Sequence, residues 1–592
     1  MSILKVLFSL VLLFICSSLN AQVATKYTLS FENASHNEAT IKAQFSNLKS
    51  SEVEITMSRS SPGRYALHEF VKNVYNLKAT NGEGKALELV RIDPYSWKVS
   101  DHDGIINLSY TLYANHGDGT YAQVDETHAH LNAPATFMYA PELSNRAVEV
   151  TFNVRTDLNW KVATQLKHLK GTTYYAEDFQ YFMDSPIEIS DYRKKSFIVD
   201  GQTINFVLHD ELATDIDFEE YVLNTQKIVL QQKAVFGQLP TFDYGEYTFL
   251  ACYMPNVSGD GMEHRNSTVL TSTRSLSHGG KERNIGTVSH EFFHCWNTER
   301  IRPKSLEPFN FKEANMSGEL WFAEGFTNYY DALTLCRSGI WSHDTYIKDM
   351  QRGFNYVWNS PGRQFFNPIE MSYQAPFVDA AKSVDEHNRQ NTFISYYNYG
   401  EMLGLALDLS LRMYNLNLDE YMKLVWEKFG KENKSYSIPD LQQTLSDYAG
   451  QEFSNTFFAN YIYKSEMPDF EKLFDNVAIK IEKREAVSFG AFVREHKLMS
   501  NPKIGTMAYD AGFKINDKII KIGDFTLSSV VNLELALSKY NIGEEVEITF
   551  ERYGKLISKK VLVKTDTNYT LSYDPEANEK KLQRKKEWLQ PK

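Results

Sequence analysis

Two histidines four residues apart, with a glutamate directly after the first, occur in the segment "HEFFHCWN" at residues 290–297. On a helix, positions four apart lie on one face, so His290 and His294 can present two imidazole nitrogens to a single ion. Glu291, one step round the helix, would lie beside the ion, which suits a base acting on activated water. The pattern predicts a catalytic zinc helix. The alternative is a core helix whose histidines are satisfied by hydrogen bonds.

A catalytic zinc usually has three protein ligands and one open position, so a third ligand is needed. We expect it to be Glu324, in the apolar helical stretch "GELWFAEGFTNYYDAL", because a carboxylate is costly to bury unpaired. Ser317 is the expected N-cap of this helix and Gly339 its end. Glu319 is the competing acid, but it lies in the first turn, where the helix dipole alone favours a negative charge. One zinc ion on His290, His294 and Glu324 is therefore predicted.

The composition describes a folded, acidic protein of several domains. A chain of 592 residues is too long for one core, and its 42% hydrophobic and 23% charged residues are typical of globular chains. The formal net charge of -12 argues against nucleic acid as a partner, because binding phosphate backbones requires a basic surface.

The first residues have the layout of a secretory leader. Lys5 precedes an apolar run from Val6 to Cys16, followed by small and polar residues ending at Ala21. The run is short for a membrane span, so a signal peptide at residues 1–21 and a secreted or periplasmic destination are predicted, with a retained anchor as the alternative. No later stretch is apolar enough for a membrane helix in the mature chain. Three scattered cysteines beyond the leader predict no disulfide framework.

The hydrophobic periodicity of the sequence predicts the strands and helices that could position the predicted ligands. Alternating runs such as "ATIKAQF" and "INLSYTLY" predict a β domain of sandwich type at residues 22–208. Longer helical patterns predict a second domain at 209–468, with helices near 317–338, 395–413 and 417–429. A further β-rich block with one helix is expected at 469–566. The charged segment 567–592 is expected to be a solvated end, with a helix as a possible form.

The segments "GTVSHEFFHCWNTERIRP" and "ELWFAEGFTNYY" resemble the glycyl aminopeptidase family, zinc peptidases of gluzincin type with a PDZ-like domain. "SPGRYALHEFVKNV" and "AYDAGFKINDKIIKIG" are similar to further family segments. The resemblance implies a multidomain α+β fold: an N-terminal β-sandwich-like domain, a thermolysin-like, mainly helical zinc-peptidase domain at 209–468, and a C-terminal PDZ-like domain at 469–566.

The resemblance also implies two site residues. "GDGMEHRNS" is similar to the segment whose glutamate binds the free α-amino group of the substrate, which maps to Glu263. "SYYNYGEMLGLALDL" is similar to a helix start whose tyrosine stabilises the oxyanion, which maps to Tyr397, with Tyr396 and Tyr399 as neighbours that could fill the role.

The chain departs from the pattern at two points. Asn328 stands where thermolysin-like enzymes often have an acid supporting a histidine ligand, so that role lacks a residue. "SFGAF", at 488–492, is the nearest match to a PDZ carboxylate loop.

The expected function is an exported zinc aminopeptidase that removes small N-terminal residues, glycine or alanine. Its partners would be peptides with a free N-terminus, together with a peptide ligand of the PDZ-like domain. The alternatives are a zinc endopeptidase with the same site, and a catalytically idle scaffold that binds peptides by strand addition.

Overall fold

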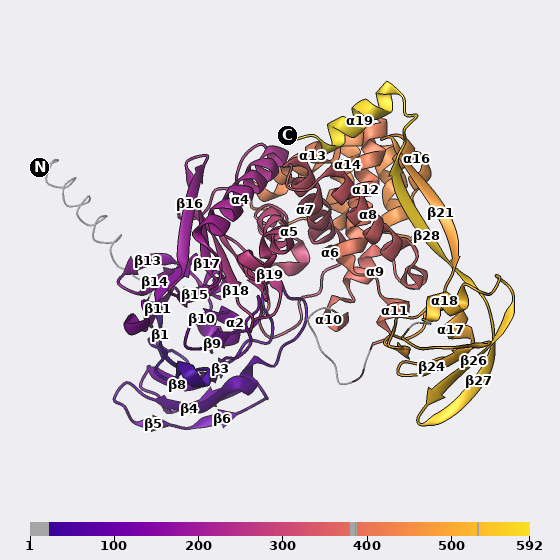
Figure 1. The fold of residues 1–592 in the computed structure, drawn as a ribbon. Coiled ribbons are helices and arrows are strands. Elements are labelled where there is room, and N and C mark those ends of the chain that lie inside the picture. Colours follow the sequence, from indigo (N-terminus) through magenta and orange to yellow (C-terminus); the bar gives the residue numbers. More distant parts are fainter. Residues whose placement is uncertain (1–22, 379–384, 386, 530–531) are drawn as a thin grey trace, which may run out of the picture. The chain divides into compact units, whose positions relative to one another are not determined.

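The structure, a computed structural model, describes residues 23–378, 385, 387–529 and 532–592 (Figure 1). The predicted signal peptide at 1–21 lies outside them. The chain divides into two compact units. The first contains the described residues up to Val222 together with Thr241–Asn284 and Phe309–Ala314. The second contains Leu223–Pro240, Ile285–Pro308 and Asn315–Lys592.

The first unit is β-rich, as predicted. Its largest sheet has eight strands in the order β13-β14-β11-β1-β2-β8-β4-β5. Alternate residues of β2 are buried, because successive side chains of a strand point to opposite faces and one face packs on the core. The strands are β1 (Thr25–Ser30), β2 (Glu38–Phe45), β4 (Val74–Thr80), β5 (Ala86–Leu87), β8 (Ile106–Tyr113), β11 (Val148–Asn153), β13 (Lys167–Lys170) and β14 (Thr173–Ala176).

Two further sheets of the first unit face each other. Ala163 of the four-stranded sheet β12-β15-β10-β9 packs against Val207 and Leu250 of the five-stranded sheet β16-β17-β18-β20-β19. The bounds are β9 (Gln123–Val124), β10 (His128–Leu131), β12 (Lys161–Thr164), β15 (Ile187–Ser190), β16 (Arg193–Val199), β17 (Gln202–His209), β18 (Glu246–Tyr253), β19 (Asp260–His264) and β20 (Ser267–Ser272). A three-stranded sheet, β3 (Val53–Thr56), β7 (Ser96–Val99) and β6 (Leu89–Arg91), completes the unit.

The central strand β18 is buried along seven of its eight residues, without alternation. It runs parallel to both neighbours, β17 and β20, and parallel strands are covered on both faces. One face meets the four-stranded sheet. On the other, Phe218 and Tyr221 of helix α4 (Asp215–Phe236) contact Phe206 of β17.

The second unit is mainly helical before residue 476, as predicted for the middle domain. Its helices are α6 (Leu320–Ala323), α7 (Gly325–Arg337), α8 (His343–Trp358), α9 (Pro368–Ser372), α10 (Ala375–Val378), α11 (Arg389–Thr392), α12 (Tyr396–Met413), α13 (Leu418–Val425), α14 (Ile438–Ala449), α15 (Gln451–Phe457) and α16 (Phe470–Asp475). It also contains most of α5 (Gly280–Phe293), the helix with the two histidines.

Helices α7 and α12 approach backbone to backbone at two glycines. A Cβ added to Gly325 would lie 2.2 Å from the Cα of Gly400, and one added to Gly400 would lie 1.8 Å from the carbonyl oxygen of Trp321. Only residues without a side chain allow this contact. It fixes the start of α12, with Tyr397, against the helices on either side of Glu324.

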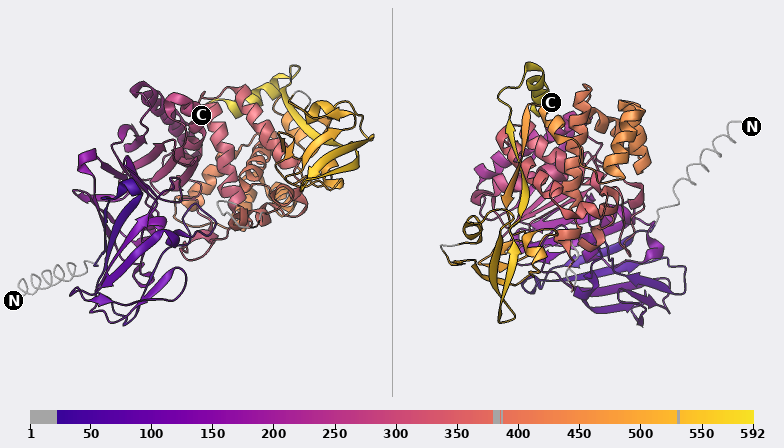
Figure 2. Two further views of the ribbon diagram at one scale, coloured as in Figure 1. Left: turned by 60° about the horizontal axis from the view of Figure 1, so that its bottom comes forward. Right: turned by 90° about the vertical axis from the view of Figure 1, so that its right-hand side faces the viewer.

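The C-terminal part of the second unit is β-rich, as expected. Strands β21 (Ile479–Val487) and β28 (Thr565–Tyr573) form a long antiparallel ribbon, visible in Figure 2. Between them a small sheet and two short helices enclose a core of their own that includes Phe489, Ile519 and Phe550. These elements are β22 (Val493–Arg494), β23 (Lys497–Leu498), α17 (Met507–Asp510), β24 (Lys518–Ile522), β25 (Phe525–Thr526), α18 (Leu533–Leu537), β26 (Glu545–Arg552) and β27 (Lys555–Leu562).

The charged segment at the end of the chain is not a solvated end, and that expectation is wrong. Its first residues belong to β28, and the rest contains helix α19 (Glu579–Leu589), whose Trp588 and Leu589 are buried. The indole nitrogen of Trp588 donates a hydrogen bond of 2.9 Å to the hydroxyl of Tyr329, and Arg337 donates one of 2.9 Å to the carbonyl of Trp588. The apolar edge of an otherwise charged helix therefore docks on α7.

Within the described part of the chain, none of the helices combines the length and apolarity needed to cross a membrane. The three cysteines in that part, Cys252, Cys295 and Cys336, are buried free thiols.

Candidate active site

The three predicted zinc ligands converge in the second unit. The Nε2 atoms of His290 and His294 lie 3.1 Å apart, and Glu324 Oε2 lies 3.6 Å from the first and 3.2 Å from the second. Three ligands of a tetrahedral ion at zinc–nitrogen and zinc–oxygen distances are separated by about 3.3–3.6 Å. The donor set and its spacing therefore fit one zinc ion, and the core-histidine alternative leaves this convergence unexplained.

Glu324 lies at a break between two helices rather than within one. The sequence predicts a single helix from Ser317, but α6 ends at Ala323 and α7 begins at Gly325, with Glu324 at the junction. Its side chain is 1% exposed, in agreement with the expected burial of this acid.

Glu319, the competing acid, has other partners. Its Oε2 accepts hydrogen bonds of 2.8 Å from the Ser317 hydroxyl and 2.9 Å from the Ser305 hydroxyl. Ser317 thus holds Glu319 instead of capping the helix as expected, and Glu319 itself is the N-cap residue of α6. The two hydroxyls compensate the burial of this carboxylate without a metal.

Each histidine is oriented through its second ring nitrogen. His290 Nδ1 lies 2.9 Å from Asp331 Oδ2, and His294 Nδ1 lies 2.5 Å from the carbonyl oxygen of Asn297. A backbone carbonyl only accepts, so the His294 proton sits on Nδ1 and its Nε2 faces the other two ligands. Such contacts fix the tautomer and ring direction of metal ligands.

Asp331 supplies the support that Asn328 lacks, and the sequence reasoning missed it. It lies seven residues after Glu324, about two turns into α7, and a search at that spacing would have found it.

Burial and charge set the protonation of the ligands. Burial lowers the pKa of His290, but the hydrogen bonds that its ring donates to Asp331 and Glu324 outweigh burial and raise that pKa well above its ordinary value. Burial raises the pKa of Glu324, but the adjacent histidines hold it far below its usual range. Glu324 is thus ionised, and the ring nitrogen of His290 must lose a proton before it binds an ion.

Glu291 lies beside the ligands, as the helix position predicts. A carboxylate oxygen of Glu291 is within 4.8 Å of a ring nitrogen of His294, and the side chain is 5% exposed. A carboxylate this close to the three candidate ligands is placed to act as a base.

The structure distinguishes the three neighbouring tyrosines. The ring of Tyr397 lies 5.9 Å from that of His290, centroid to centroid, and is partly exposed. Tyr396 and Tyr399 are buried, and the latter packs edge-on against Trp358. Tyr397 is therefore the one that adjoins the ligands.

Glu263 belongs to the first unit and lies on β19, the edge strand of the five-stranded sheet, where it is 6% exposed. The Pro-Gly segment singled out in the sequence packs on this strand: a Cβ at Gly63 would lie 2.9 Å from Glu263 Oε2, and Arg64 forms an ion pair with Asp260. The positive φ of 75° at Gly63 also favours glycine. This contact holds the Glu263 strand in place, while its binding of an amine stays a prediction.

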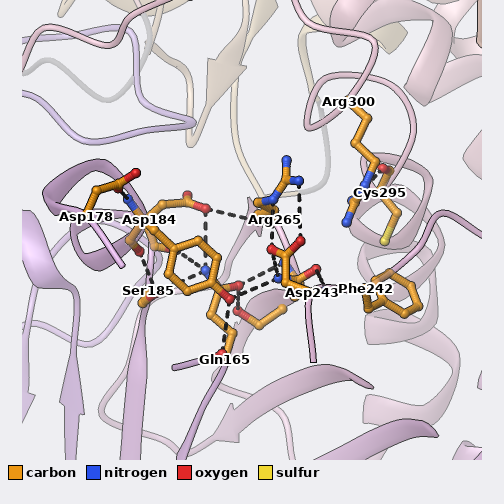
Figure 3. Close-up of polar contacts among 12 residues, drawn as sticks. Gln165, Asp178, Asp184, Ser185, Phe242, Asp243, Arg265, Cys295 and Arg300 are labelled. Atoms are coloured by element: carbon orange, nitrogen blue, oxygen red, sulfur yellow. Dashed lines mark hydrogen bonds and ion pairs between the residues drawn. The ribbon is translucent and has the colours of Figure 1, made fainter. Parts of the chain in front are cut away.

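The turn after Glu263 is anchored by the polar network of Figure 3. Asp184 accepts hydrogen bonds from the ring of His264, at 2.9 Å, and from the amide of Arg265, at 3.0 Å. The side chain of Arg265 pairs with Asp243 at 2.9 Å. Gln165 accepts from the amide of Asn266 at 2.9 Å. These contacts hold the turn between β19 and β20 in place.

Behind His290 lies a small cavity of about 270 Å³, lined by Asp331, Asp349, Arg352 and Glu401 among others. Burial, followed by the charges of Asp331 and Asp349, raises the pKa of Glu401 to about 8. Glu401 is therefore a neutral acid at neutral pH.

Comparisons with solved structures identify the fold. A crystal structure of an aminopeptidase N family protein from Idiomarina loihiensis matches 96% of this chain and 100% of its own, with a TM-score of 0.86 at 24% identity. That likeness shows a shared multidomain fold. An M1 zinc metallopeptidase mutant from Deinococcus radiodurans, bound to a Tyr-Ser-Ala substrate, matches 75% of this chain and 94% of its own at 12% identity, with a TM-score of 0.45, which is too low to support an argument.

A curated relative matches only a part of the chain. The serine protease Do-like HtrA of Lactococcus lactis subsp. cremoris is 29% identical over 102 residues, 17% of this chain and 24% of that protein. The chain thus spans about a quarter of this relative.

Family models match both functional parts. Residues 26–191 match the peptidase M61 N-terminal domain, and residues 283–403, which include the three candidate ligands, match M61 glycyl aminopeptidase. These two matches confirm the resemblance to glycyl aminopeptidases seen in the motifs, and they identify the chain as a metallo-aminopeptidase.

Proposed function

We propose that this zinc peptidase is an exported aminopeptidase that removes small residues, glycine or alanine, from peptides with a free N-terminus. The observation that carries the proposal is the convergence of His290, His294 and Glu324 to ligand-to-ligand distances of 3.1–3.6 Å. Zinc held there would polarise the scissile carbonyl and lower the pKa of a water.

The residues around the ligands have separate tasks in this proposal. Glu291 takes the proton of the attacking water and passes it to the leaving amine. Tyr397 donates its phenol hydrogen to the oxyanion as it forms. Asp331 keeps the His290 ring in the direction that binding requires.

Glu263 is assigned to the substrate ammonium. A fixed carboxylate recognises one positive charge and thereby selects the chain end over an internal bond. Its position on a rigid edge strand, held by the Pro-Gly segment and the Asp184 network, supports a positioning task of this kind.

A panel of aminoacyl amides, each free and N-acetylated, tests the exopeptidase claim. We expect hydrolysis of the free glycyl and alanyl compounds and a large loss on acetylation. Equal rates on free and acetylated substrates would show an endopeptidase with the same site.

Two variants separate the alternatives. Glu263→Ala should remove most activity of an exopeptidase and leave an endopeptidase nearly unchanged. Glu291→Gln should remove activity from a protein that still binds zinc, whereas a scaffold would have no activity to lose.

Export is part of the proposal and rests on the leader-like residues 1–21. Expression of the full chain with cell fractionation tests it: we expect a mature protein that begins after the leader, outside the cytoplasm.

The C-terminal block is proposed to bind a peptide as a PDZ-like domain. A cavity of about 750 Å³ lies between the "SFGAF" loop and α18, with Phe489, Phe492, Leu533 and Leu537 among its lining. Gly490 has a φ of 84°, and a Cβ there would lie 2.1 Å from that of Thr506, so the loop requires glycine. Titration with peptides bearing a free or an amidated C-terminus tests this; we expect binding only of the free form.

A further inference from the structure

A second group of metal-ligating side chains lies in the first unit, separate in sequence and fold from the peptidase site. His128 on β10, Glu188 on β15 and Cys252 on β18 each offer one ligand atom, and these atoms lie within 4.8 Å of one another. None of the three side chains is more than 1% exposed. The group lies between the facing four- and five-stranded sheets.

Two of the three distances within the group equal those between ligands of a tetrahedral ion, and the third is within 4.8 Å. His128 Nδ1 lies 3.4 Å from Glu188 Oε1 and 3.6 Å from Cys252 Sγ. Ligands of one zinc ion, at zinc–nitrogen, zinc–oxygen and zinc–sulfur lengths, are separated by about 3.3–3.8 Å. The 3.6 Å between Nδ1 and Sγ is the length of a hydrogen bond to sulfur and also that of an edge between two zinc ligands.

Neighbouring groups direct the His128 ring so that Nδ1 faces the other two ligands. The amide nitrogen of Gln123 donates to the carbonyl of Asn256 at 3.1 Å, which turns the Gln123 oxygen toward His128 Nε2, at 3.2 Å. An amide oxygen only accepts, so the proton of a neutral His128 sits on Nε2. Nδ1 then presents its lone pair toward Glu188 and Cys252.

Glu188 is held in the same way. Its second oxygen, Oε2, lies 3.1 Å from His130 Nδ1, and His130 Nε2 lies 2.9 Å from the carbonyl of Asp118. This contact engages Oε2 and leaves Oε1 directed at His128. Supporting contacts of this kind surround metal sites.

From this geometry we propose that His128, Glu188 and Cys252 bind a structural zinc-class divalent ion that ties β10 and β15 of one sheet to β18 of the other. Imidazole, carboxylate and thiolate together favour zinc or cobalt over magnesium or calcium, which prefer oxygen ligands alone. Binding forms a metal–sulfur bond, breaks the S–H bond of Cys252 and releases that proton to solvent. This ion is additional to the one proposed for catalysis.

A Cys252 that binds an ion is a thiolate, whereas a Cys252 in a buried polar network without an ion is a thiol, and this difference gives a direct spectroscopic distinction.

Cobalt loading followed by absorption spectroscopy tests the proposal, because only a thiolate ligand gives a sulfur-to-cobalt charge-transfer band in the near ultraviolet. The proposed catalytic ligands include no sulfur. We expect the band in the wild type, in His294→Ala and in Cys336→Ser, a control that changes another buried thiol, and its loss in Cys252→Ser. No band in the cobalt-loaded wild type, or a band that survives in Cys252→Ser, would overturn the proposal.

Metal content gives the second measurement. We expect two zinc ions per chain in the wild type, one in His294→Ala and one in Cys252→Ser. If the wild type contains one zinc ion and His294→Ala contains none, then His128, Glu188 and Cys252 form a polar network that binds no ion. The ion count and the cobalt spectrum of the wild type each test the proposal without a variant. The test therefore does not depend on whether every variant folds.

Discussion

Asp331 Oδ2 lies 2.9 Å from His290 Nδ1, so the acid on α7 two turns beyond Glu324 orients a histidine on α5. The segment that begins with Glu324 and continues through α7 thereby supplies both a ligand and the support of another ligand.

Replacing this acid should weaken the site without removing a ligand. For Asp331→Asn we expect a loss of about 10–100-fold in metal affinity or activity, because supporting acids fix ring direction and raise ligand basicity. Metal affinity can be measured by competition with a chelator. Asp349→Asn is the matched control, since Asp349 lines the same cavity and pairs with Arg352 on its own helix. Equal losses in both variants would refute the orienting role.

The phenol of Tyr397 should matter in the transition state and not in metal binding. For Tyr397→Phe we expect kcat to fall by about 10²–10³-fold, the usual cost of an oxyanion donor, with KM and zinc content little changed. Tyr396→Phe, which changes the buried neighbour, should keep near wild-type kcat. If the two variants lose activity equally, Tyr397 is not the donor.

Gly400 should be intolerant of any side chain. Its Cβ would lie 1.8 Å from the carbonyl oxygen of Trp321, a backbone atom that moves only with its helix. We expect Gly400→Ala to destabilise the protein by about 1–3 kcal/mol or more and to lower activity, because α12 must shift away from α6 and α7.

Gly286→Ala on α5 is the control for Gly400. A Cβ there meets nothing within 4 Å, so we expect a gain of about 0.5–1 kcal/mol from the helix preference of alanine. Thermal unfolding of both variants provides the comparison, and a Gly400→Ala variant as stable as the wild type would contradict the close approach.

The raised pKa of Glu401 predicts a pH-dependent stability. Burial and the acids Asp331 and Asp349 raise this pKa from 4.5 to about 8. Between these values the unfolded chain has lost the proton that the folded chain retains, so stability falls as pH rises, by about 1.4 kcal/mol per pH unit for one proton. Arg352, which lines the same cavity, is the nearby positive charge.

Glu401→Gln cannot ionise and should lack this contribution. We expect equal stability of variant and wild type near pH 4.5, a growing advantage of the variant up to pH 8, and a constant difference above it. Urea unfolding of both proteins across this range measures the difference. A difference that does not change with pH would show that Glu401 ionises normally in the folded protein.

The sequence predicted those features that depend only on residues close together in the chain. The periods of 2.0 and 3.6 residues predicted strands such as β2 and helices such as α12, and the spacing of His290 and His294 follows directly from helix geometry. Burial of a lone acid then identified Glu324.

What it could not predict depends on tertiary contacts. The helix break at Glu324 and the preference of Ser317 for Glu319 arise from packing rather than from local propensity. Trp588 is one of few apolar positions in a charged segment, and its contact with Tyr329 shows where it docks. His128, Glu188 and Cys252 lie on three strands, separated by at least sixty residues, so no motif links them.

The central claim is that one ion is shared by His290, His294 and Glu324. Crystals grown with zinc and measured at its absorption edge test it most directly. The account predicts an anomalous-scattering peak within about 2.0–2.2 Å of His290 Nε2, His294 Nε2 and a Glu324 oxygen. A map with no peak at these atoms, or with the three side chains directed apart, would contradict it.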